Sequence, residues 1–426
     1  MDEDIVITGA SIVCSLGNTL AEVWDALLSS RHGIRPIEGF DTSGFSCKTA
    51  AQVRGIDPSE LGIARRDARI MGKHSCMLIK CSRDAYRDAK IDGASVPGED
   101  IGFFVGMGMV DYSIDDLLPA VVKSLGPDGN LDYDRFYTAG YQEIYPLWPL
   151  SMLNNISFCQ AAIGLNIRGE NTVFSPHADS GGQAIAEGAL TVLEKKAAVV
   201  FAGGVSEMVS PLSIARAGIF EILNESCDES GMRCRPFGQN RKGTVLGEGC
   251  GIVSLETKSS ADGRCAGYSA RVDGYGYACQ KDEEALCPSV SAMSQSMEQA
   301  LAVAGIDLND IDLIIAHGDG TINSDRNEAE AIHNVFHNCL SRIIVYSSKS
   351  ALGNLLAASP AVDVILGSCM IEHGIIPPSP FMDTPDSSAG FRLVTGGPLR
   401  FRPERIMINA FSYEGQCTSL IIGAVR

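Results

Sequence analysis

Three residues of this chain that could do chemistry are His317, Lys349 and Asn354. His317 directly follows the apolar run 310–316 and precedes Gly318. A histidine in that position can donate a hydrogen bond to a carbonyl oxygen and can exchange a proton near neutral pH. Lys349 and Asn354 follow in a second short stretch, but an asparagine amide only donates or accepts hydrogen bonds. The pattern therefore offers hydrogen-bond donors rather than two proton-transfer groups.

A second stretch of interest is the turn over residues 172–182, which reads Thr-Val-Phe-Ser-Pro-His-Ala-Asp-Ser-Gly-Gly. A strand over 172–174 and helical spacing over 181–194 place Ala178 near the start of a helix, where the helix dipole lowers the pKa of a thiol. Alanine has no lone pair and no titratable proton. Ser180 lies roughly 200° further around the helix axis, so its hydroxyl points away from the direction of Ala178. His177 either titrates near neutral pH or is structural.

The composition predicts a folded α/β protein of more than one domain or of a duplicated domain. The chain has 426 residues, of which 45% are hydrophobic and 20% charged, with 45 glycines. No run approaches the roughly 18–20 apolar residues of a membrane span. The acidic start Met1–Asp4 has the wrong charge for a signal peptide. We expect a cytoplasmic protein that does not bind membranes.

Charge and cysteine spacing exclude further classes of function. The net charge of −18 opposes binding to nucleic acid and to anionic lipid. The 14 cysteines form no C-x-x-C pair and match no zinc-site spacing. We expect reduced thiols and no metal site.

Alternating helical and strand patterns predict a layered α/β architecture with an internal repeat. The helical stretch 76–89 precedes the apolar run 101–106, and the stretch 291–304 precedes the run 310–316 in the same way. The polar, turn-rich residues 258–264 predict a surface loop between the halves 1–260 and 261–426.

Residues 109–150 are unusually aromatic. Aromatic enrichment favours a protein interface or a tunnel wall, and ordinary packing of a long insertion is the alternative. The aromatic residues are Tyr112, Tyr133, Phe136, Tyr137, Tyr141, Tyr145 and Trp148.

Five ordered motifs resemble the β-ketoacyl synthases of the thiolase fold. The resemblance implies an α/β thiolase fold with a duplicated five-layer αβαβα architecture. The motifs are Ile5–Gly9 with Ser15–Asn18, Arg235–Phe237 with Gly243–Gly249, Ala316–Thr321 with Asp325 and Glu328, Ser347–Asn354, and Asn409–Gly415.

The resemblance also implies that the catalytic groups have been lost. The family holds its acyl group on a cysteine at a helix start and uses two histidines, a supporting lysine and backbone amides. Ala178 takes the place of the cysteine, His317 that of the first histidine and Asn354 that of the second. Lys349 matches the lysine, which we expect to hold a carboxylate, Glu328. We therefore predict no catalytic residue and a vestigial site.

The loop expected to gate the channel and supply an oxyanion donor, Phe411–Glu414, also departs from the family. Its members tend to have Gly-Phe-Gly-Gly where this chain has Ser412-Tyr413-Glu414-Gly415. Tyr413 is expected to block the channel. Glu414 either places a carboxylate near the oxyanion donor or points to solvent.

The function that this resemblance implies is that of a non-condensing subunit, similar to a chain-length factor of a type II polyketide synthase. It would be inactive alone, pair with an active ketosynthase as a heterodimer, and shape the acyl tunnel. The complex would meet an acyl carrier protein bearing phosphopantetheine, with no cofactor bound permanently. One alternative is a malonyl-carrier-protein decarboxylase that uses His317 and Asn354 without a nucleophile. Another is a homodimeric acyl-binding protein without chemistry.

Overall fold

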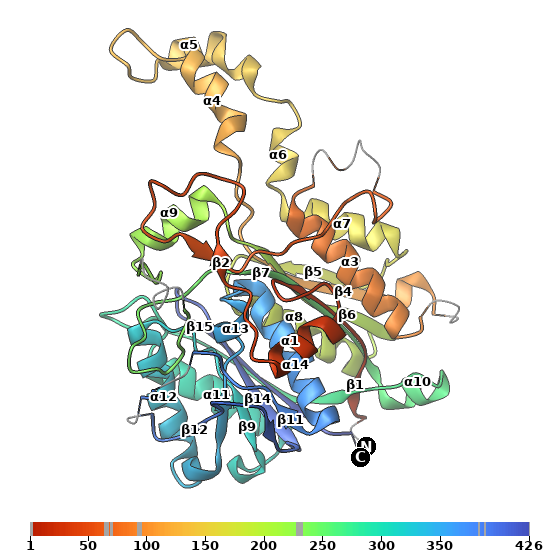
Figure 1. Ribbon diagram of the computed structural model, residues 1–426. Coiled ribbons are helices and arrows are strands. Elements are labelled where there is room, and N and C mark those ends of the chain that lie inside the picture. The colour runs from red at the N-terminus through yellow and green to blue at the C-terminus, as the bar shows by residue number, and fades with distance from the viewer. Residues whose placement is uncertain are drawn as a thin grey trace.

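The computed structural model describes residues 3–63, 68, 71–91, 96–226, 233–381, 384–386 and 389–425. A mixed 11-stranded sheet crosses this part of the chain in the order β12-β10-β9-β14-β15-β8-β1-β7-β6-β4-β5 (Figure 1). Its strands are β1 (Ile5–Cys14), β4 (Ile101–Met107), β5 (Asn171–Phe174), β6 (Val199–Glu207), β7 (Glu248–Thr257), β8 (Ala270–Cys279), β9 (Leu313–Ile315), β10 (Ile344–Tyr346), β12 (Arg392–Leu393), β14 (Arg405–Phe411) and β15 (Gln416–Gly423). Two short pairs are β2 (Arg35–Pro36) with β3 (Thr49–Ala50) and β11 (Ile375–Ile376) with β13 (Leu399–Arg400).

Helices cover both faces of this sheet and fill the space between its two halves. The α-helices are α1 (Leu20–Leu28), α3 (Lys73–Asp88), α4 (Ile114–Lys123), α5 (Tyr133–Thr138), α6 (Trp148–Ser151), α7 (Asn154–Gly164), α8 (Ser180–Leu193), α9 (Pro211–Ile219), α10 (Lys258–Gly263), α11 (Val290–Ala304), α12 (Ile322–Phe336), α13 (Lys349–Leu352) and α14 (Ser359–His373). Short 3₁₀ turns are η1 (Gly98–Asp100), η2 (Gly140–Glu143), η3 (Leu308–Asp310), η4 (Leu340–Arg342) and η5 (Leu356–Ala358).

The order of the layers follows from the alternation of side chains along the strands. On β4, Phe104 packs into the cluster beneath α8, whereas Phe103 and Val105 point to the other face, toward α3 and α7. On β15, Leu420 faces α14 while Ile421 faces α11. Helices α8 and α14 thus form the middle layer, with α3 and α11 outside. The predicted five-layer αβαβα order is confirmed.

Glycines bring the start of α8 close to the strands beneath it. A Cβ atom on Gly106 of β4 would lie 2.2 Å from the backbone nitrogen of Gly181, and a Cβ atom on Gly181 would lie 2.3 Å from the carbonyl oxygen of Ala357. Only glycine permits such an approach. The turn that carries Ala178 is therefore held rigidly against β4 and η5.

One predicted loop is a helix. Residues 258–263 form α10, because Thr257 caps it by accepting the Ser260 N–H and Lys258 forms an ion pair with Asp262 at 3.1 Å. The prediction of a surface loop at 258–264 was wrong, since the polar composition that suggested a turn also suits an exposed capped helix.

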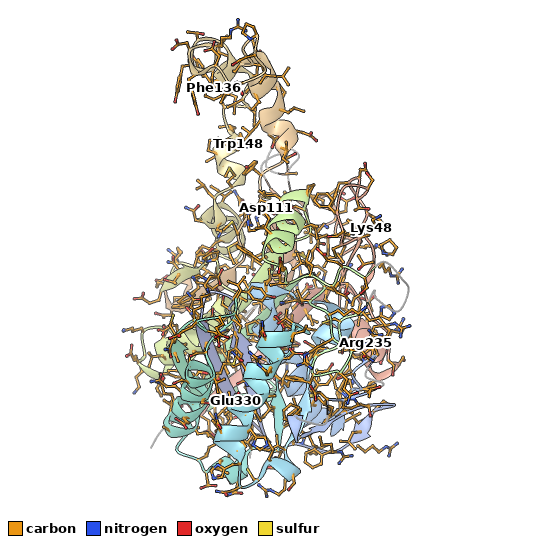
Figure 2. All side chains as sticks on the ribbon, turned by 90° about the vertical axis from the view of Figure 1, so that its left-hand side faces the viewer. Lys48, Asp111, Phe136, Trp148, Arg235 and Glu330 are labelled. Carbon is orange, nitrogen blue, oxygen red and sulfur yellow. The ribbon has the colours of Figure 1, made fainter. Side chains whose placement is uncertain are left out.

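Residues 113–147, here called the arm, project away from the body of the molecule (Figure 1). The arm contains α4, α5 and η2. In the orthogonal view Phe136 lies near its tip, Trp148 where the chain returns, and Asp111 at its base (Figure 2). The alternative of ordinary packing for this segment was wrong. None of the helices among the described residues is long and apolar enough to cross a bilayer.

Candidate functional site

In the turn before α8, the backbone amide of Ala178 is already hydrogen-bonded within the protein. β5 ends at Phe174 and α8 begins at Ser180, so Ala178 lies at the helix start as predicted, with its side chain buried. The Ala178 N–H donates to Ser412 Oγ at 3.3 Å. The resemblance to the ketosynthases makes this amide the expected donor to a developing oxyanion. Here Ser412 already occupies it.

The Glu414 side chain is 56% exposed, and its carboxylate contacts the serine that accepts from this amide. Ser412 Oγ donates to Glu414 Oε2, and the same oxygen lies 3.4 Å from His177 Nδ1. Gln416 Nε2 donates to His177 Nε2 at 3.2 Å, so the proton of a neutral His177 belongs on Nδ1, facing Glu414. The hydroxyl of Ser412 thus links the Ala178 amide to the carboxylate of Glu414.

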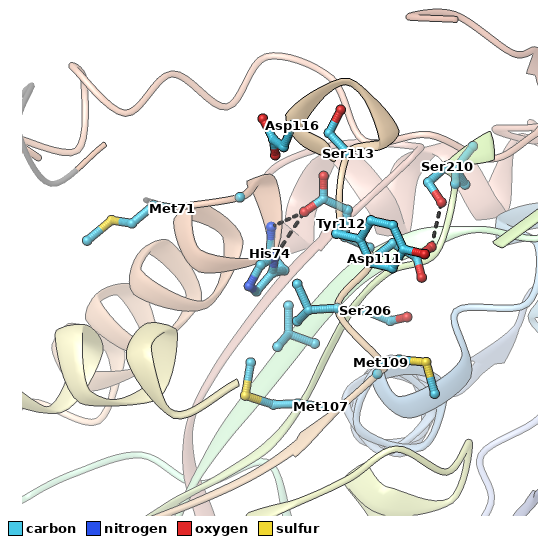
Figure 3. Close-up of a pocket in the computed structure, with 16 residues that line it drawn as sticks. Met71, His74, Met107, Met109, Asp111, Tyr112, Ser113, Asp116, Ser206 and Ser210 are labelled. Atoms are coloured by element: carbon cyan, nitrogen blue, oxygen red, sulfur yellow. Dashed lines mark hydrogen bonds and ion pairs between the residues drawn. The ribbon is translucent and has the colours of Figure 1, made fainter. Parts of the chain in front are cut away.

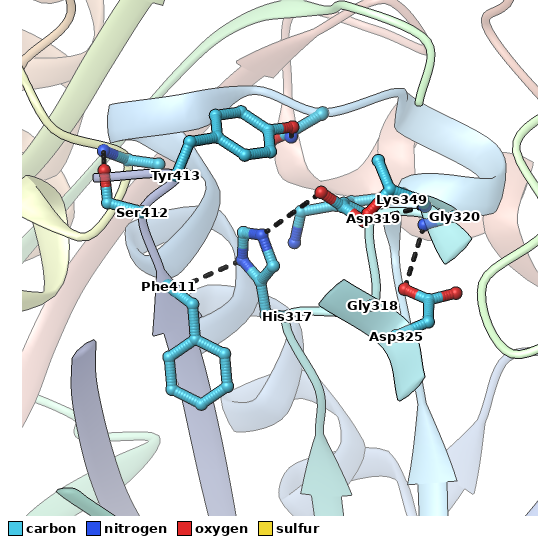
Figure 4. Close-up of polar contacts among 12 residues, drawn as sticks. His317, Gly318, Asp319, Gly320, Asp325, Lys349, Phe411, Ser412 and Tyr413 are labelled. Atoms are coloured by element: carbon cyan, nitrogen blue, oxygen red, sulfur yellow. Dashed lines mark hydrogen bonds and ion pairs between the residues drawn. The ribbon is translucent and has the colours of Figure 1, made fainter. Parts of the chain in front are cut away.

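His317 is held as a neutral, hydrogen-bonded imidazole. Only 3% of the residue is exposed, and the Phe411 N–H donates to its Nδ1 at 3.2 Å, which leaves the proton on Nε2. Nε2 lies 3.8 Å from Asp319 Oδ2 (Figure 4). Burial, followed by the charge of Lys349, lowers the pKa of His317. Its ring accepts a hydrogen bond from the end of β14 at Nδ1 and faces the Asp319 carboxylate at Nε2.

Asp319 stays ionised although it is fully buried. Burial favours its neutral form, but the Nε2–H of His317 and the two groups of Thr321 that donate to Oδ1 outweigh that effect and lower the pKa of Asp319. The family usually has threonine at this position, so Asp319 introduces a negative charge into the site.

Asp319→Asn is expected to weaken the fold at neutral pH and to lose this effect in acid. Because the pKa of Asp319 is lower in the folded chain than its value of 3.8 in the unfolded chain, the ionised carboxylate stabilises the fold above about pH 4. That contribution disappears as the pH falls toward 2. Urea unfolding midpoints of wild type and D319N at pH 7, 4 and 2.5 should converge in acid, and a gap independent of pH would contradict the assignment.

Lys349 does not pair with Glu328, contrary to expectation. Its Nζ is buried and makes no hydrogen bond or ion pair with any described residue. Glu328 instead accepts from the His317 N–H at 2.8 Å, the Gly318 N–H at 2.7 Å and Asn409 Nδ2 at 3.2 Å. Burial raises the pKa of Glu328 to about 7 against the pull of these donors. Backbone amides satisfy the carboxylate, so the lysine was not needed.

Asn354 and Tyr413 close the space between the donors and Ala178. Asn354 Nδ2 donates to Tyr413 Oη at 3.2 Å, and its Oδ1 accepts from the Leu356 N–H at 3.1 Å. The Tyr413 ring lies beside His317 and Asp319 (Figure 4). Burial, and after it the Asp319 carboxylate, raises the pKa of the Tyr413 hydroxyl well above its usual value. Both polar atoms of Asn354 are engaged.

A cavity of about 110 Å³ reaches Ala178 but not the donors. Its wall is mainly apolar and includes Leu246, Leu356 and side chains of α9, with Tyr413 on the inner side. His317, Lys349 and Asn354 do not line it. A molecule in this cavity would meet a methyl group at 178, with Tyr413 between it and the donors.

Two features of the loop differ from what the sequence suggested. Phe411 is not part of the loop, because it is the last residue of β14 and its ring is buried in the core. The contact of Ser412 with the Ala178 amide was not predicted. The sequence feature that could have indicated this contact is Ser412 itself, which has a hydroxyl at a position where the family tends to have glycine.

Comparison with known protein families places this geometry in context. The model described as "Beta-ketoacyl synthase, N-terminal domain" matches residues 2–261, and the model described as "Beta-ketoacyl synthase, C-terminal domain" matches residues 269–382.

Relatives with known names or structures cover the whole chain. The 3-oxoacyl-[acyl-carrier-protein] synthase 2 of Coxiella burnetii is 27% identical over 99% of this chain and 98% of its own. The protein of the same name from Synechocystis sp. is 26% identical over 98% and 97%. A solved structure described as the ishigamide ketosynthase/chain length factor is similar with a TM-score of 0.87, at 25% identity and full coverage of both chains.

Proposed function

The chain belongs to the β-ketoacyl synthase family, and we propose that it is a non-condensing member of that family. In this role it pairs with a cysteine-bearing ketosynthase as a heterodimer and shapes the acyl tunnel, as a chain-length factor does. The halves 1–260 and 261–426 are its two ketosynthase-like repeats. Polyketide or related acyl-chain synthesis is the pathway class in which such a pair would act.

One observation carries the proposal: the groups that condensation needs are blocked one by one in the same site. Position 178 has no nucleophile, and the Ala178 N–H already donates a hydrogen bond to Ser412 Oγ. Tyr413 separates the cavity at 178 from His317 and Asn354. The loss of the cysteine alone would be compatible with an otherwise working site. Here the nucleophile, the oxyanion donor and access to the two side-chain donors are all lost together.

The same arrangement does not favour a decarboxylase. Decarboxylation of a malonyl thioester requires donors that reach the thioester carbonyl. His317 and Asn354, the donors assigned to that alternative, do not line the cavity. Asn354 Nδ2 donates to Tyr413 Oη, and His317 Nε2 lies 3.8 Å from Asp319 Oδ2.

Support for the partners comes from the relatives. The curated relatives are named as synthases that act on an acyl carrier protein, and the similar solved structure is described as a ketosynthase/chain length factor. We propose that a carrier protein with a phosphopantetheine arm delivers acyl groups to the cysteine of the partner subunit.

Native mass spectrometry of this chain co-expressed with the cysteine-bearing ketosynthase of its own genome tests the pairing. The proposal predicts a one-to-one complex that, after incubation with acyl-carrier protein, carries a covalent acyl group on the partner and none on this chain. An acyl adduct on this chain, or no complex with any ketosynthase of that genome, would contradict it.

A further inference from the structure

A pocket of about 240 Å³ lies between the ends of β4 and β6 and the start of α3 (Figure 3). It shares only Gly108 and Met109 with the cavity at Ala178, so the two are different sites. A cavity of roughly 150 Å³ can hold benzene, so this pocket has room for a small organic molecule. Part of its wall is apolar and consists of Met71, Met107, Met109, Val110, Val205 and Val209.

Glu207 brings an ionised carboxylate into this pocket. Its Oε2 accepts from the His74 backbone N–H at 2.8 Å and lies 3.0 Å from His74 Nδ1. His74 Nε2 lies 3.4 Å from Ser75 Oγ, so a neutral imidazole with its proton on Nδ1 satisfies both contacts. Burial raises the pKa of Glu207, but the contacts with His74 outweigh burial and hold that pKa below its usual value. Oε1 of Glu207 makes no hydrogen bond with any described residue.

Two more carboxylates line the pocket, and only one of them is paired with a cation. Asp111 accepts from two serine hydroxyls at the start of α9, and Arg216 Nη2 lies 3.4 Å from its Oδ1. Asp116 forms no ion pair with any described residue. His74 is the one basic side chain among the described residues of the lining, since Lys73 is paired with a carboxylate outside the pocket. The pocket therefore keeps an excess of negative charge.

The hydroxyl of Ser206 is an independent sign of a ligand. Ser206 lies at the end of β6 and lines the pocket, and only 1% of the residue is exposed. Its Oγ has no hydrogen-bond partner among the described residues. Buried hydroxyls in folded proteins are nearly always paired with protein, water or a ligand. A ligand with several N–H donors could pair with Ser206 and with the free oxygen of Glu207.

The lining of the pocket defines a small organic cation as its ligand. An anion would be repelled by the carboxylates. Within the described part of the chain, no three His, Cys, Asp or Glu side chains are grouped so that they could hold a metal ion. A protonated amine has three N–H donors for the free acceptors, and the ring of Tyr112 in the same wall attracts cations.

We propose that this pocket binds a small aliphatic amine. The ammonium group is held by Glu207 and Ser206, and the hydrocarbon chain packs against the methionines and valines of the wall. This inference does not rest on the proposed function, because the whole pocket belongs to this chain.

Isothermal titration calorimetry of the full chain alone tests the inference, with pentylamine as the probe and pentanol as its neutral analogue. Both are titrated at pH 7 in 150 mM NaCl, where exposed charges more than about 8 Å apart are largely screened. Pentylamine should bind at one site and at least tenfold more tightly than pentanol. No binding of pentylamine, or equal affinity for the two molecules, would overturn the proposal.

Three variants locate the bound amine. Glu207→Gln keeps the shape of the side chain and removes its charge, so it should weaken pentylamine binding at least tenfold and leave pentanol unaffected. Ser206→Ala should weaken it about threefold, and it decides the matter if E207Q does not fold. The matched control Glu283→Gln removes an exposed carboxylate elsewhere and should stay within twofold. Wild-type affinity in both E207Q and S206A, or an equal loss in E283Q, would show that pentylamine binds outside this pocket.

Discussion

Glu328→Ala is expected to lower the free energy of unfolding by about 3–5 kcal/mol. The substitution leaves three buried donors without an acceptor, namely the N–H groups of His317 and Gly318 and the amide of Asn409. Each unpaired buried donor costs about 1–3 kcal/mol, and a cavity adds to the loss. This is the largest loss of stability that we expect from the site.

Urea unfolding followed by circular dichroism measures this loss. Glu330→Ala is the matched control, because it removes an exposed carboxylate from the same helix, α12, and should change stability by no more than about 0.5 kcal/mol. A loss below about 1 kcal/mol in E328A would show that Glu328 does not hold the strand end at His317. Failure of E328A to fold while E330A folds normally agrees with the prediction.

The second large effect concerns where the nucleophile lies. Replacing the partner's nucleophilic cysteine with alanine is expected to reduce condensation by the complex at least 10³-fold, because no other group can hold the acyl chain. Ala178→Cys in this chain should leave the activity of the complex within twofold. A thiol at 178 would still face Ser412 on its amide and Tyr413 in front of the donors, and Asn354 cannot exchange a proton.

Rates of acyl-chain extension by four complexes check this: wild type, partner cysteine variant, A178C, and both together. If this chain is non-condensing, A178C does not restore the activity that the partner cysteine variant has lost. Rescue to more than a few per cent of wild-type activity would show that the site around 178 is still competent.

The fold and the position of the site could be predicted because they depend on local patterns. The apolar runs 101–106 and 310–316 predicted β4 and β9, and the helical stretches before them are α3 and α11. The strand and helix spacing around Ala178 predicted its place at a helix start. These signals survive in the sequence because each strand or helix must bury one face.

The contacts inside the site could not be predicted in the same way. Ser412 meets the Ala178 amide across 234 positions, and only the folded loop decides which group accepts that hydrogen bond. Lys349 was expected to pair with Glu328 because opposite charges attract. Nothing in the sequence indicates that the N–H groups of His317 and Gly318 donate hydrogen bonds to the Glu328 carboxylate. The helix α10 was missed because its cap, Thr257, belongs to the preceding strand.

The position of the aromatic arm relative to the body also could not be predicted from the sequence. Its composition predicted an interface or a tunnel wall, and composition alone did not distinguish them from ordinary packing. The projection of the arm from the body decides against ordinary packing (Figures 1 and 2).

The most direct test of the central claim is the rate of carbon dioxide release and acyl-chain extension from malonyl-carrier protein. Three samples are compared: this chain alone, the cysteine-bearing ketosynthase alone, and the two together. The account predicts background rates for this chain alone and extension by the pair at least 100-fold above the ketosynthase alone. Carbon dioxide release by this chain alone, or full activity of the ketosynthase without it, would contradict the account.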